Sequence, residues 1–215
     1  MTFSRWLAAV LLLAVLSSCS SGKRSAEFTL NGVEAPQGVC PVDPQSFSRA
    51  TAVADFSEGN GCGVHNGYRV TAVDDIGFTE TALVTCDVVD SLHGWIKATV
   101  QPLAQQVYGQ KIVAFKIAAS YACRPRNNQR GAKLSEHGQG NAIDIAGFIL
   151  SDGREVNVAR DYYGNGQDQR FLHGVRAQAC GTFHTVLGPG SDPFHRDHIH
   201  LDMQQDRRGG GPYCH

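Results

Sequence analysis

The sequence predicts an α+β domain in which helices flank an antiparallel sheet. Three observations lead to this fold class. Strand-like and helix-like segments follow one another in a mixed order, without the regular strand–helix–strand alternation that builds a parallel sheet. The composition favours a loop-rich domain, with 24 glycines and only 42% hydrophobic residues. A chain of 215 residues suits one domain with a single core.

The longest predicted helix runs from residue 87 to residue 108. Its apolar residues recur with helical spacing at positions 88, 92, 95, 96, 100, 103 and 107. Pro102 lies inside this helix and should kink or split it, because proline lacks the N–H that a helix interior requires. A second amphipathic helix is predicted over residues 168–180, with Gly181 as its C-terminal cap.

Six segments are predicted as strands, on β-branched or continuous apolar composition. They cover residues 68–73, 111–120, 141–150, 154–158, 182–187 and 198–203. The segment over residues 141–150 is typical of a buried strand with Asp144 pointing from one face, and residues 154–158 are its expected antiparallel partner.

The first residues resemble an export signal. Arg5 precedes an apolar run over residues 6–16, which is too short to cross a bilayer as a helix of ~20 residues. Leu16-Ser17-Ser18-Cys19 follows and resembles a bacterial lipobox; the alternative is an ordinary secretory signal with a coincidental cysteine. We therefore expect a signal peptide over residues 1–18, a lipidated Cys19, a flexible tether over 19–38 and a domain over 39–215.

These features predict a protein of the periplasm or cell envelope, anchored to a membrane through the lipid on Cys19. The formal net charge is −1, so nothing in the composition indicates nucleic-acid binding. The sequence carries no signal for an oligomeric state.

The cysteine count supports export. Six cysteines remain after Cys19, and an even number in an exported chain predicts three disulfides. A cysteine-ligated metal is the weaker alternative, because no two cysteines form a C-x-x-C pair. Proximity in the sequence favours the pairs Cys40–Cys62, Cys86–Cys123 and Cys180–Cys214.

The candidate metal-binding and catalytic residues lie in two clusters of histidines and acids, which are about 55 residues apart in the sequence. The first is SEHGQGNAID, residues 135–144, and the second is HRDHIH, residues 195–200. Together they offer His137, Asp144 and His200, three N and O donors of the kind that a catalytic zinc site needs, with a fourth position left for water. Alternatively, Asp144 orients a ligand histidine without binding the metal. The remaining histidines at positions 65, 93, 173, 184 and 215 are predicted to be structural or surface residues.

The two clusters resemble known zinc peptidases. The pattern S-x-H-x-x-G-x-A-x-D over residues 135–144 is similar to the first metal motif of D-alanyl-D-alanine carboxypeptidases of the vancomycin-resistance type. The segment over residues 120–124 loosely resembles their S-G-Y-R segment, and HRDHIH resembles the penicillin-insensitive murein endopeptidases. The combination, over residues 112–203, is similar to the bacterial extensin-like C-terminal domain family.

This resemblance implies a zinc peptidase core of the LAS and hedgehog type, with His137, Asp144 and His200 as ligands of Zn²⁺. It implies that Arg124 contacts the substrate and its developing negative charge. It also places three further residues at the substrate: Tyr121, Ser135 and His195.

The resemblance leaves two residues as the candidate general base. The carboxypeptidases have a glutamate three residues before the last ligand, where this chain has the shorter Asp197. The endopeptidases rely on the first histidine of H-x-H, here His198. In a regular strand only one of these neighbours can face the metal, and phase favours His198 because it shares a face with His200.

The predicted function is an exported zinc metallopeptidase that cleaves peptidoglycan stem peptides or their D-Ala crosslinks. One alternative is a non-catalytic, zinc-containing lipoprotein that binds or scaffolds the cell wall. Another is an amidase or a different peptidase with the same metal chemistry, because loop shape rather than the metal selects the bond.

Overall fold

The computed structural model describes residues 43–205 and 211–215. The strands are β1 (Ser48–Val53), β2 (Phe56–Gly59), β3 (Cys62–Val64), β4 (Gly67–Val73), β5 (Ile76–Thr85), β6 (Ile112–Ala119), β7 (Ala142–Leu150), β8 (Glu155–Asn157), β9 (Thr185–Leu187), β10 (Ile199–Asp202) and β11 (Tyr213–Cys214). The helices are α1 (Cys86–Trp95), the π-helical η2 (Ile96–Val100), α2 (Gln101–Tyr108), α3 (Val158–Asp161) and α4 (Gln167–Ala179). Three short 3₁₀ turns complete the elements: η1 (Pro44–Ser46), η3 (Arg126–Asn128) and η4 (Glu136–Gln139).

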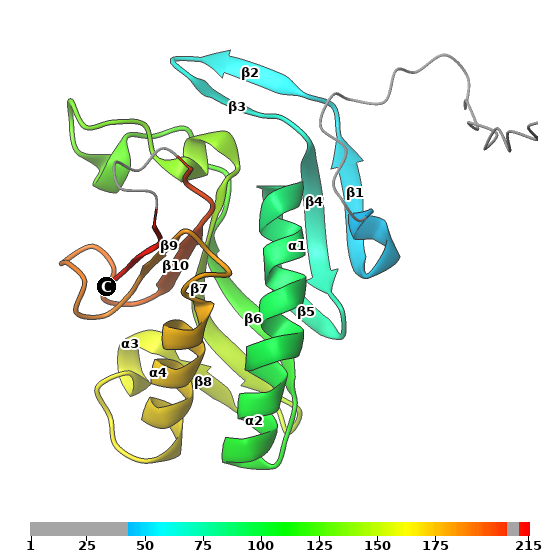
Figure 1. The fold of residues 1–215 in the computed structure, drawn as a ribbon, viewed down its shortest axis with the longest axis vertical. Helices are drawn as coiled ribbons and strands as arrows, with labels where there is room; N and C mark the ends of the chain where they lie inside the picture. Colours follow the sequence, from blue (N-terminus) through cyan, green and yellow to red (C-terminus); the bar gives the residue numbers. More distant parts are fainter. Residues whose placement is uncertain (1–42, 206–210) are drawn as a thin grey trace, which may run out of the picture. The chain divides into compact units, whose positions relative to one another are not determined.

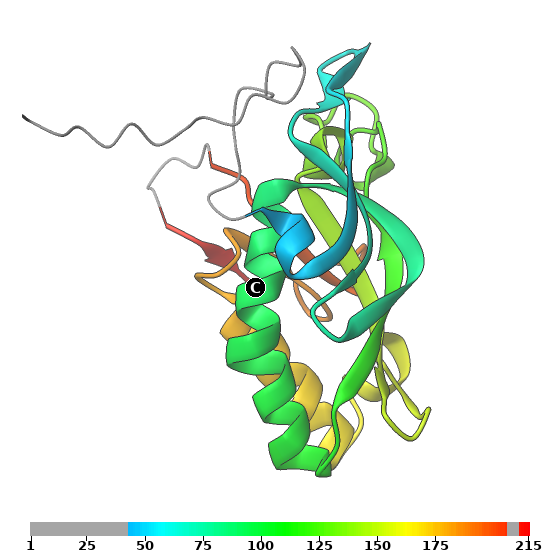
Figure 2. The same cartoon turned by 90° about the vertical axis from the view of Figure 1, so that its right-hand side faces the viewer.

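One large sheet organises the described part of the chain. Its strand order is β1-β4-β5-β6-β7-β10-β9-β11, with β8 paired to β7 (Figure 1). Strands β2 and β3 form a separate hairpin. Helices α1, α2 and α4 cover one face of the sheet (Figure 2). The structure is therefore a mixed α/β domain with a large sheet and a few helices, as the sequence predicted in outline.

The sheet is mostly but not wholly antiparallel. β6, β7, β10 and β9 pair antiparallel in succession, whereas β5 pairs parallel to β6 and β11 parallel to β9. The predicted antiparallel sheet is therefore confirmed for most strand pairs, and these two parallel pairs are the exceptions. The helical segment from α1 to α2 explains why β5 and β6 are parallel. Parallel neighbours need a long crossover connection, and this segment joins β5 to β6.

The helix predicted over residues 87–108 is present and is interrupted near Pro102. It runs as α1, η2 and α2 without a loop, and Pro102 lies in the first turn of α2, directly after the π-helical segment. A proline cannot donate a hydrogen bond to the preceding turn and its ring crowds the carbonyl of residue i−4, and the wider π-helical turn lies directly before it. Among the described residues, no helix combines the length and the apolarity that crossing a membrane requires.

An aromatic cluster lies between the sheet and the helices. Trp95 of α1 is fully buried, contacts Phe115, Phe148 and Phe183, and donates its indole N–H to the carbonyl of Val175 at 3.0 Å. The hydrogen bond satisfies the one polar atom of this side chain inside the core. Trp95 is therefore a core residue, and it fixes α1 and α4 against β6 and β7.

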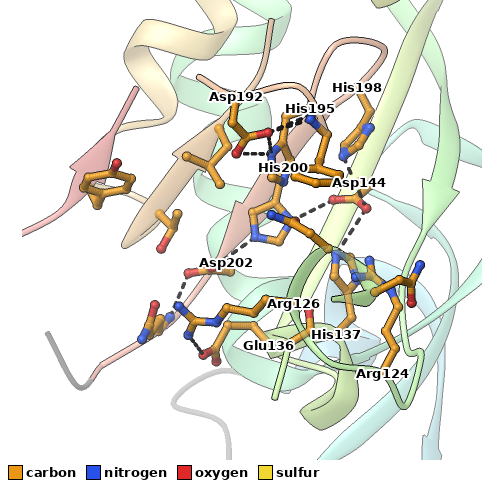
Figure 3. Close-up of a pocket in the computed structure, with 18 residues that line it drawn as sticks. Arg124, Arg126, Glu136, His137, Asp144, Asp192, His195, His198, His200 and Asp202 are labelled. Atoms are coloured by element: carbon orange, nitrogen blue, oxygen red, sulfur yellow. Dashed lines mark hydrogen bonds and ion pairs between the residues drawn. The ribbon is translucent and has the colours of Figure 1, made fainter. Parts of the chain in front are cut away.

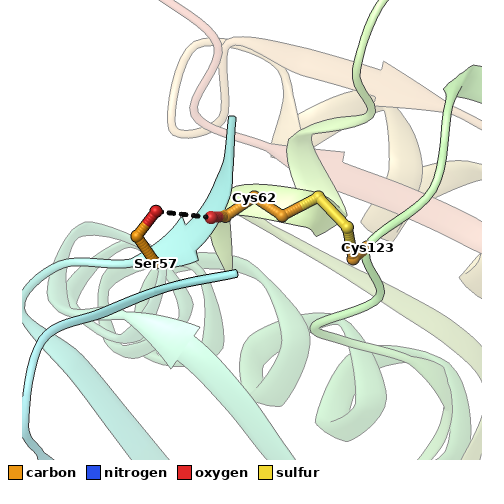
Figure 4. The surroundings of a disulfide bond; sticks show 3 residues. All are labelled: Ser57, Cys62 and Cys123. Carbon is orange, nitrogen blue, oxygen red and sulfur yellow. Dashed lines mark hydrogen bonds between the residues drawn. A yellow bond between two sulfur atoms is a disulfide. The ribbon is translucent and has the colours of Figure 1, made fainter. Parts of the chain in front are cut away.

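Two of the three disulfides predicted from sequence proximity are wrong. Cys180 pairs with Cys214 as expected. Cys62 pairs instead with Cys123, which excludes Cys40–Cys62 and Cys86–Cys123 (Figure 4). The tip of the β2–β3 hairpin reaches the loop after β6, so residues 61 positions apart meet in space. Cys86 is also disulfide-bonded, while Cys40 and Cys19 lie outside the described residues.

Candidate metal centre

Three of the predicted site residues converge in the centre of the sheet. Asp144 on β7 and His200 on β10 occupy directly opposed positions of antiparallel strands. His137 lies on η4, immediately before β7. One donor atom from each of the three side chains falls within 4.8 Å of the others, and all three side chains are buried (Figure 3).

Glycines bring His137 back over β7. Gly140 follows η4 with a φ of 66°, a left-handed conformation that glycine adopts without strain. A Cβ at Gly140 would lie 2.9 Å from a methyl group of Val64, and one at Gly138 would lie 2.8 Å from Leu134. The glycines of the first cluster therefore allow a tight turn against β3, and the loop then enters β7 as the sequence predicted.

Hydrogen bonds determine which ring nitrogen of His137 and of His200 points toward Asp144. The Nδ1–H of His137 donates to the carbonyl of Ser120 at 2.6 Å, so its Nε2 faces Asp144 Oδ2 at 3.1 Å. The Nε2–H of His200 donates to Asp202 Oδ2 at 2.9 Å, so its Nδ1 faces Asp144 Oδ1 at 2.8 Å. The two inward nitrogens are 3.2 Å apart. Each ring is thus held from behind, in the manner typical of histidines that bind metals.

Asp202 is a site residue that the sequence analysis missed. It is buried, lies two residues after His200 on β10, and therefore shares a face of the sheet with it. The sequence did contain one indication of this role, because an acidic residue two positions after His200 in a strand lies on the same face as His200. Without the position of β9, whose Thr185 opposes Asp202, nothing in the sequence indicated that this carboxylate would be buried.

Burial and ion pairing act in opposite directions on the charges here. Burial raises the pKa of Asp144, but hydrogen bonds from His137 and His200 outweigh it and hold that pKa well below its usual range. Burial lowers the pKa of His200, but the carboxylates of Asp144 and Asp202 outweigh it and raise the pKa to about 9. Burial also raises the pKa of Asp202, but the hydrogen bond and the charge of His200 outweigh it, so the pKa of Asp202 is lowered. The cluster therefore holds two buried carboxylates that require a positive charge between them.

The donor set fits a zinc ion. Zinc prefers imidazole nitrogen and carboxylate oxygen at about 2.0–2.1 Å, and tetrahedral geometry then separates the ligand atoms by about 3.3 Å. The observed separations of 2.8–3.2 Å among the inward atoms of His137, Asp144 and His200 are close to this value. These three residues could hold a metal, with Asp202 and the Ser120 carbonyl orienting the two imidazoles.

The two candidate bases differ in where they point. The side chain of His198 is 15% exposed, and its Nε2 lies 3.6 Å from Asp144 Oδ2, too far for a hydrogen bond. Its Nδ1–H donates to Asp197 Oδ1 at 2.8 Å. The side chain of Asp197 is 72% exposed and lies on the outer side of that imidazole. Both residues precede β10, so strand phase does not govern them, and His198 alone of the two lines the cavity.

His195 forms a second histidine–carboxylate pair beside the first. Its Nδ1–H donates to both oxygens of Asp192, at 2.8 and 2.9 Å. Its ring lies 5.2 Å from that of His198 and 5.5 Å from that of His200, measured between centroids. Burial is the main reason that the pKa of His195 is lowered, so a neutral ring is favoured at this position. Asp192 was also missed by the sequence analysis.

An open cavity of about 520 Å³ lies above the three donors. Ser135, His195 and Arg124, which the resemblance assigns to the substrate, line it. Arg126 also lines it but is engaged with Glu136 at 3.4 Å. Tyr121 does not line the cavity; its ring packs edge-on against Phe56 in the β2–β3 hairpin, so the structure does not bring it to the site.

The fold and the site define a mixed α/β domain with a buried His-Asp-His cluster beneath an open polar cavity. Over residues 40–215 the chain matches the family described as Extensin-like protein C-terminus, and it belongs to this family. The comparisons with curated proteins and with solved structures gave no match.

Proposed function

We propose that this protein is an exported zinc-dependent peptidase that acts on peptides of the cell wall. The observation that carries the proposal is the set of three buried donors at the floor of an open cavity, in which both histidines are turned inward by a hydrogen-bond partner behind the ring. A purely structural metal site needs no such opening, since its ligands close around the ion. The resemblance to LAS and hedgehog-type cores agrees with this arrangement and forms part of the proposal.

His137, Asp144 and His200 are the proposed ligands. When bound, zinc supplies a Lewis acid that polarises the scissile carbonyl and lowers the pKa of water. The remaining chemistry belongs to side chains of the cavity. The Nε2 of His198 faces the donor cluster and can accept a proton, because its other nitrogen already donates to Asp197. Asp197 then orients this imidazole and stabilises it once it is protonated.

Arg124 is the proposed stabiliser of negative charge on the substrate. It lines the cavity, and among the described residues no ion pair is formed by its guanidinium, whereas Arg126 is committed to Glu136. A cation of this kind favours the oxyanion that develops when a peptide carbonyl is attacked. Ser135 and His195 are the remaining residues that we assign to substrate contact.

The substrate class rests on the sequence. The proposed substrates are peptidoglycan stem peptides or their D-Ala crosslinks, which follow from the resemblance and from the export signal over residues 1–18. Lipidation of Cys19 would tether the protein to a membrane of the cell envelope. These residues lie outside the part of the chain that the structure describes.

Digestion of purified muropeptides tests the proposal. The domain without residues 1–19, loaded with zinc, should release products that mass spectrometry identifies. His198→Ala should keep one zinc per chain and lose about 10²–10⁴-fold in kcat, while Asp197→Asn should lose less, because only His198 faces the ligands. The reverse pattern would make Asp197 the base. If the protein binds one zinc per chain but cleaves no muropeptide, the peptidase proposal is wrong, and a zinc-containing protein that binds the cell wall becomes the favoured function.

A further inference from the structure

Exposed aromatic rings gather at the cavity. Among the residues that the structure describes, four large hydrophobic side chains are exposed: Val113, Tyr163, Phe194 and Tyr213. Two of the four, Phe194 and Tyr213, line the cavity above the donor cluster, with 45% and 42% of their surfaces exposed. An apolar ring left in water beside a polar cavity is a common feature of ligand-binding surfaces.

The sheet places Tyr213 at a defined distance from the donors. Asp202 opposes Thr185 across β10 and β9, and Thr185 opposes Tyr213 across β9 and β11. Two interstrand spacings, about 10 Å, separate Tyr213 from Asp202, and His200 lies two residues further along β10, so the backbone of Tyr213 is about 12 Å from that of His200. An extended peptide covers this distance in about three to four residues. A group bound at Tyr213 would therefore be attached about three to four residues from the bond at the donor cluster.

The backbone beneath both rings is held firmly. The N–H of Tyr213 donates to the carbonyl of His184 at 2.7 Å, and the next residue is bridged to Cys180. The N–H of Phe194 donates to Asp192 Oδ1 at 2.7 Å, and the same carboxylate holds His195. The backbone beneath each ring is therefore fixed, and the ring of Tyr213 packs against that of His215 with 4.3 Å between the centroids, so the ordering cost of binding a ligand is reduced.

Amide side chains line the same cavity as the two rings. Asn127 and Asn128 line it from η3, both with φ values near 55°, and Gln204 lines it after β10. A cavity that offers both aromatic faces and amide donors and acceptors suits a ligand that has one apolar face and a polar edge. A pyranose ring has this character, because its C–H groups form a face while its hydroxyl and acetamido groups form the edge.

We propose that Tyr213 and Phe194 form a subsite for a sugar ring attached to the peptide substrate. The subsite makes this protein selective for glycan-linked peptides over free ones. The inference rests on the proposed peptidase function, and it names the part of the substrate that lies beyond the scissile bond.

The test compares two substrates that share one peptide: a disaccharide-linked muropeptide and the same peptide after enzymatic removal of its sugars. The wild-type protein should show the larger kcat/KM on the disaccharide-linked form. Tyr213→Ala and Phe194→Ala should each lower the ratio of the two kcat/KM values roughly three- to tenfold, the range expected for one aromatic contact. Tyr213→Phe, which keeps the ring, should preserve the ratio.

Tyr163→Ala is the matched control, because Tyr163 is 69% exposed but does not line the cavity. It should leave the ratio unchanged. Equal losses on both substrates in Tyr213→Ala would overturn the sugar subsite while the peptidase stands. If neither substrate is cleaved, the peptidase proposal fails, and saturation-transfer NMR with a β-1,4-linked amino-sugar disaccharide decides the subsite alone. Binding that Tyr213→Ala weakens would support it, and absence of binding to the wild-type protein would overturn it.

Discussion

Asp202→Asn should weaken zinc binding although Asp202 is not a proposed ligand. In the native site Asp202 Oδ2 accepts the Nε2–H of His200, and Oδ1 accepts the backbone N–H of Gln204. An asparagine that keeps the bond to Gln204 must turn its NH₂ group toward His200. Two donors would then face each other, so the imidazole would favour the tautomer with its proton on Nδ1, the nitrogen that faces Asp144.

The expected loss is one to two orders of magnitude in zinc affinity, or about 1–3 kcal/mol, the range typical of partners that orient a metal ligand. Competition with a chromophoric chelator at pH 7.5 measures this affinity directly. His200→Ala, which removes a donor, should lose far more.

Asp192→Asn is the matched control. Asp192 lines the same cavity and holds the imidazole of His195, which is not a proposed ligand. Zinc affinity should stay within about twofold of the wild-type value in this variant, because the carboxylate acts on a different ring. If Asp202→Asn binds zinc as tightly as the wild-type protein does, or if both asparagine variants lose the same affinity, then Asp202 does not set the tautomer of His200.

Two further predictions concern stability, and a third concerns a disulfide. The pKa of His200 is raised to about 9 from 6.5, so its stabilising contribution is complete below about pH 6.5 and is lost as pH rises through 9. Urea unfolding of the zinc-free protein should show that the free energy of unfolding falls by about 3 kcal/mol over this pH range, and His200→Gln should abolish the fall. A free energy of unfolding that does not change with pH would refute this prediction. Trp95→Ala removes a fully buried ring and leaves the carbonyl of Val175 without its donor, so it should destabilise by about 3–5 kcal/mol in the same assay. Peptide mapping without reductant should join Cys86 to Cys40, since the other four cysteines of the six pair among themselves; a free thiol at either position would contradict this.

The sequence was sufficient to predict the floor of the site. The strand over residues 141–150 was recognisable because it is apolar throughout, and Asp144 was the one charge inside it. The spacing of His137, Asp144 and His200 then predicted that three donors would meet, and the structure brings them together. Their role as zinc ligands stays a prediction.

The partners behind these donors could not be predicted in the same way. Asp202 becomes a partner of His200 only because β9 covers it, and Asp192 reaches His195 through a loop turn. Both depend on tertiary packing, which a single sequence does not display. Asp197 and His198 were expected to obey strand alternation, but the strand begins one residue later, at Ile199.

Other elements were missed although the sequence carried a signal. The β2–β3 hairpin turns at Asn60-Gly61, whose φ values of 51° and 79° are both positive, and an Asn-Gly pair is a strong indicator of such a turn. This hairpin carries Cys62 to Cys123, so missing the turn also led to the wrong disulfide pairs. Proximity along the chain succeeded only for Cys180–Cys214, which lie 34 residues apart.

Two disulfides lie next to the walls of the cavity, and one of them also reaches its floor. Cys123 immediately precedes Arg124, and Cys214 immediately follows Tyr213. The Cys62–Cys123 bridge also lies against the turn of His137, since a Cβ at Gly138 would lie 3.4 Å from the sulfur of Cys62, and Ala122 donates its N–H to the carbonyl of His137 at 3.1 Å. In the proposed enzyme, the Cys180–Cys214 bridge supports one wall of the cavity, whereas the Cys62–Cys123 bridge supports both Arg124 and the turn that carries His137. Thiol reductants would therefore loosen residues assigned to the substrate and one proposed ligand together, so the proposed activity would require an oxidising compartment.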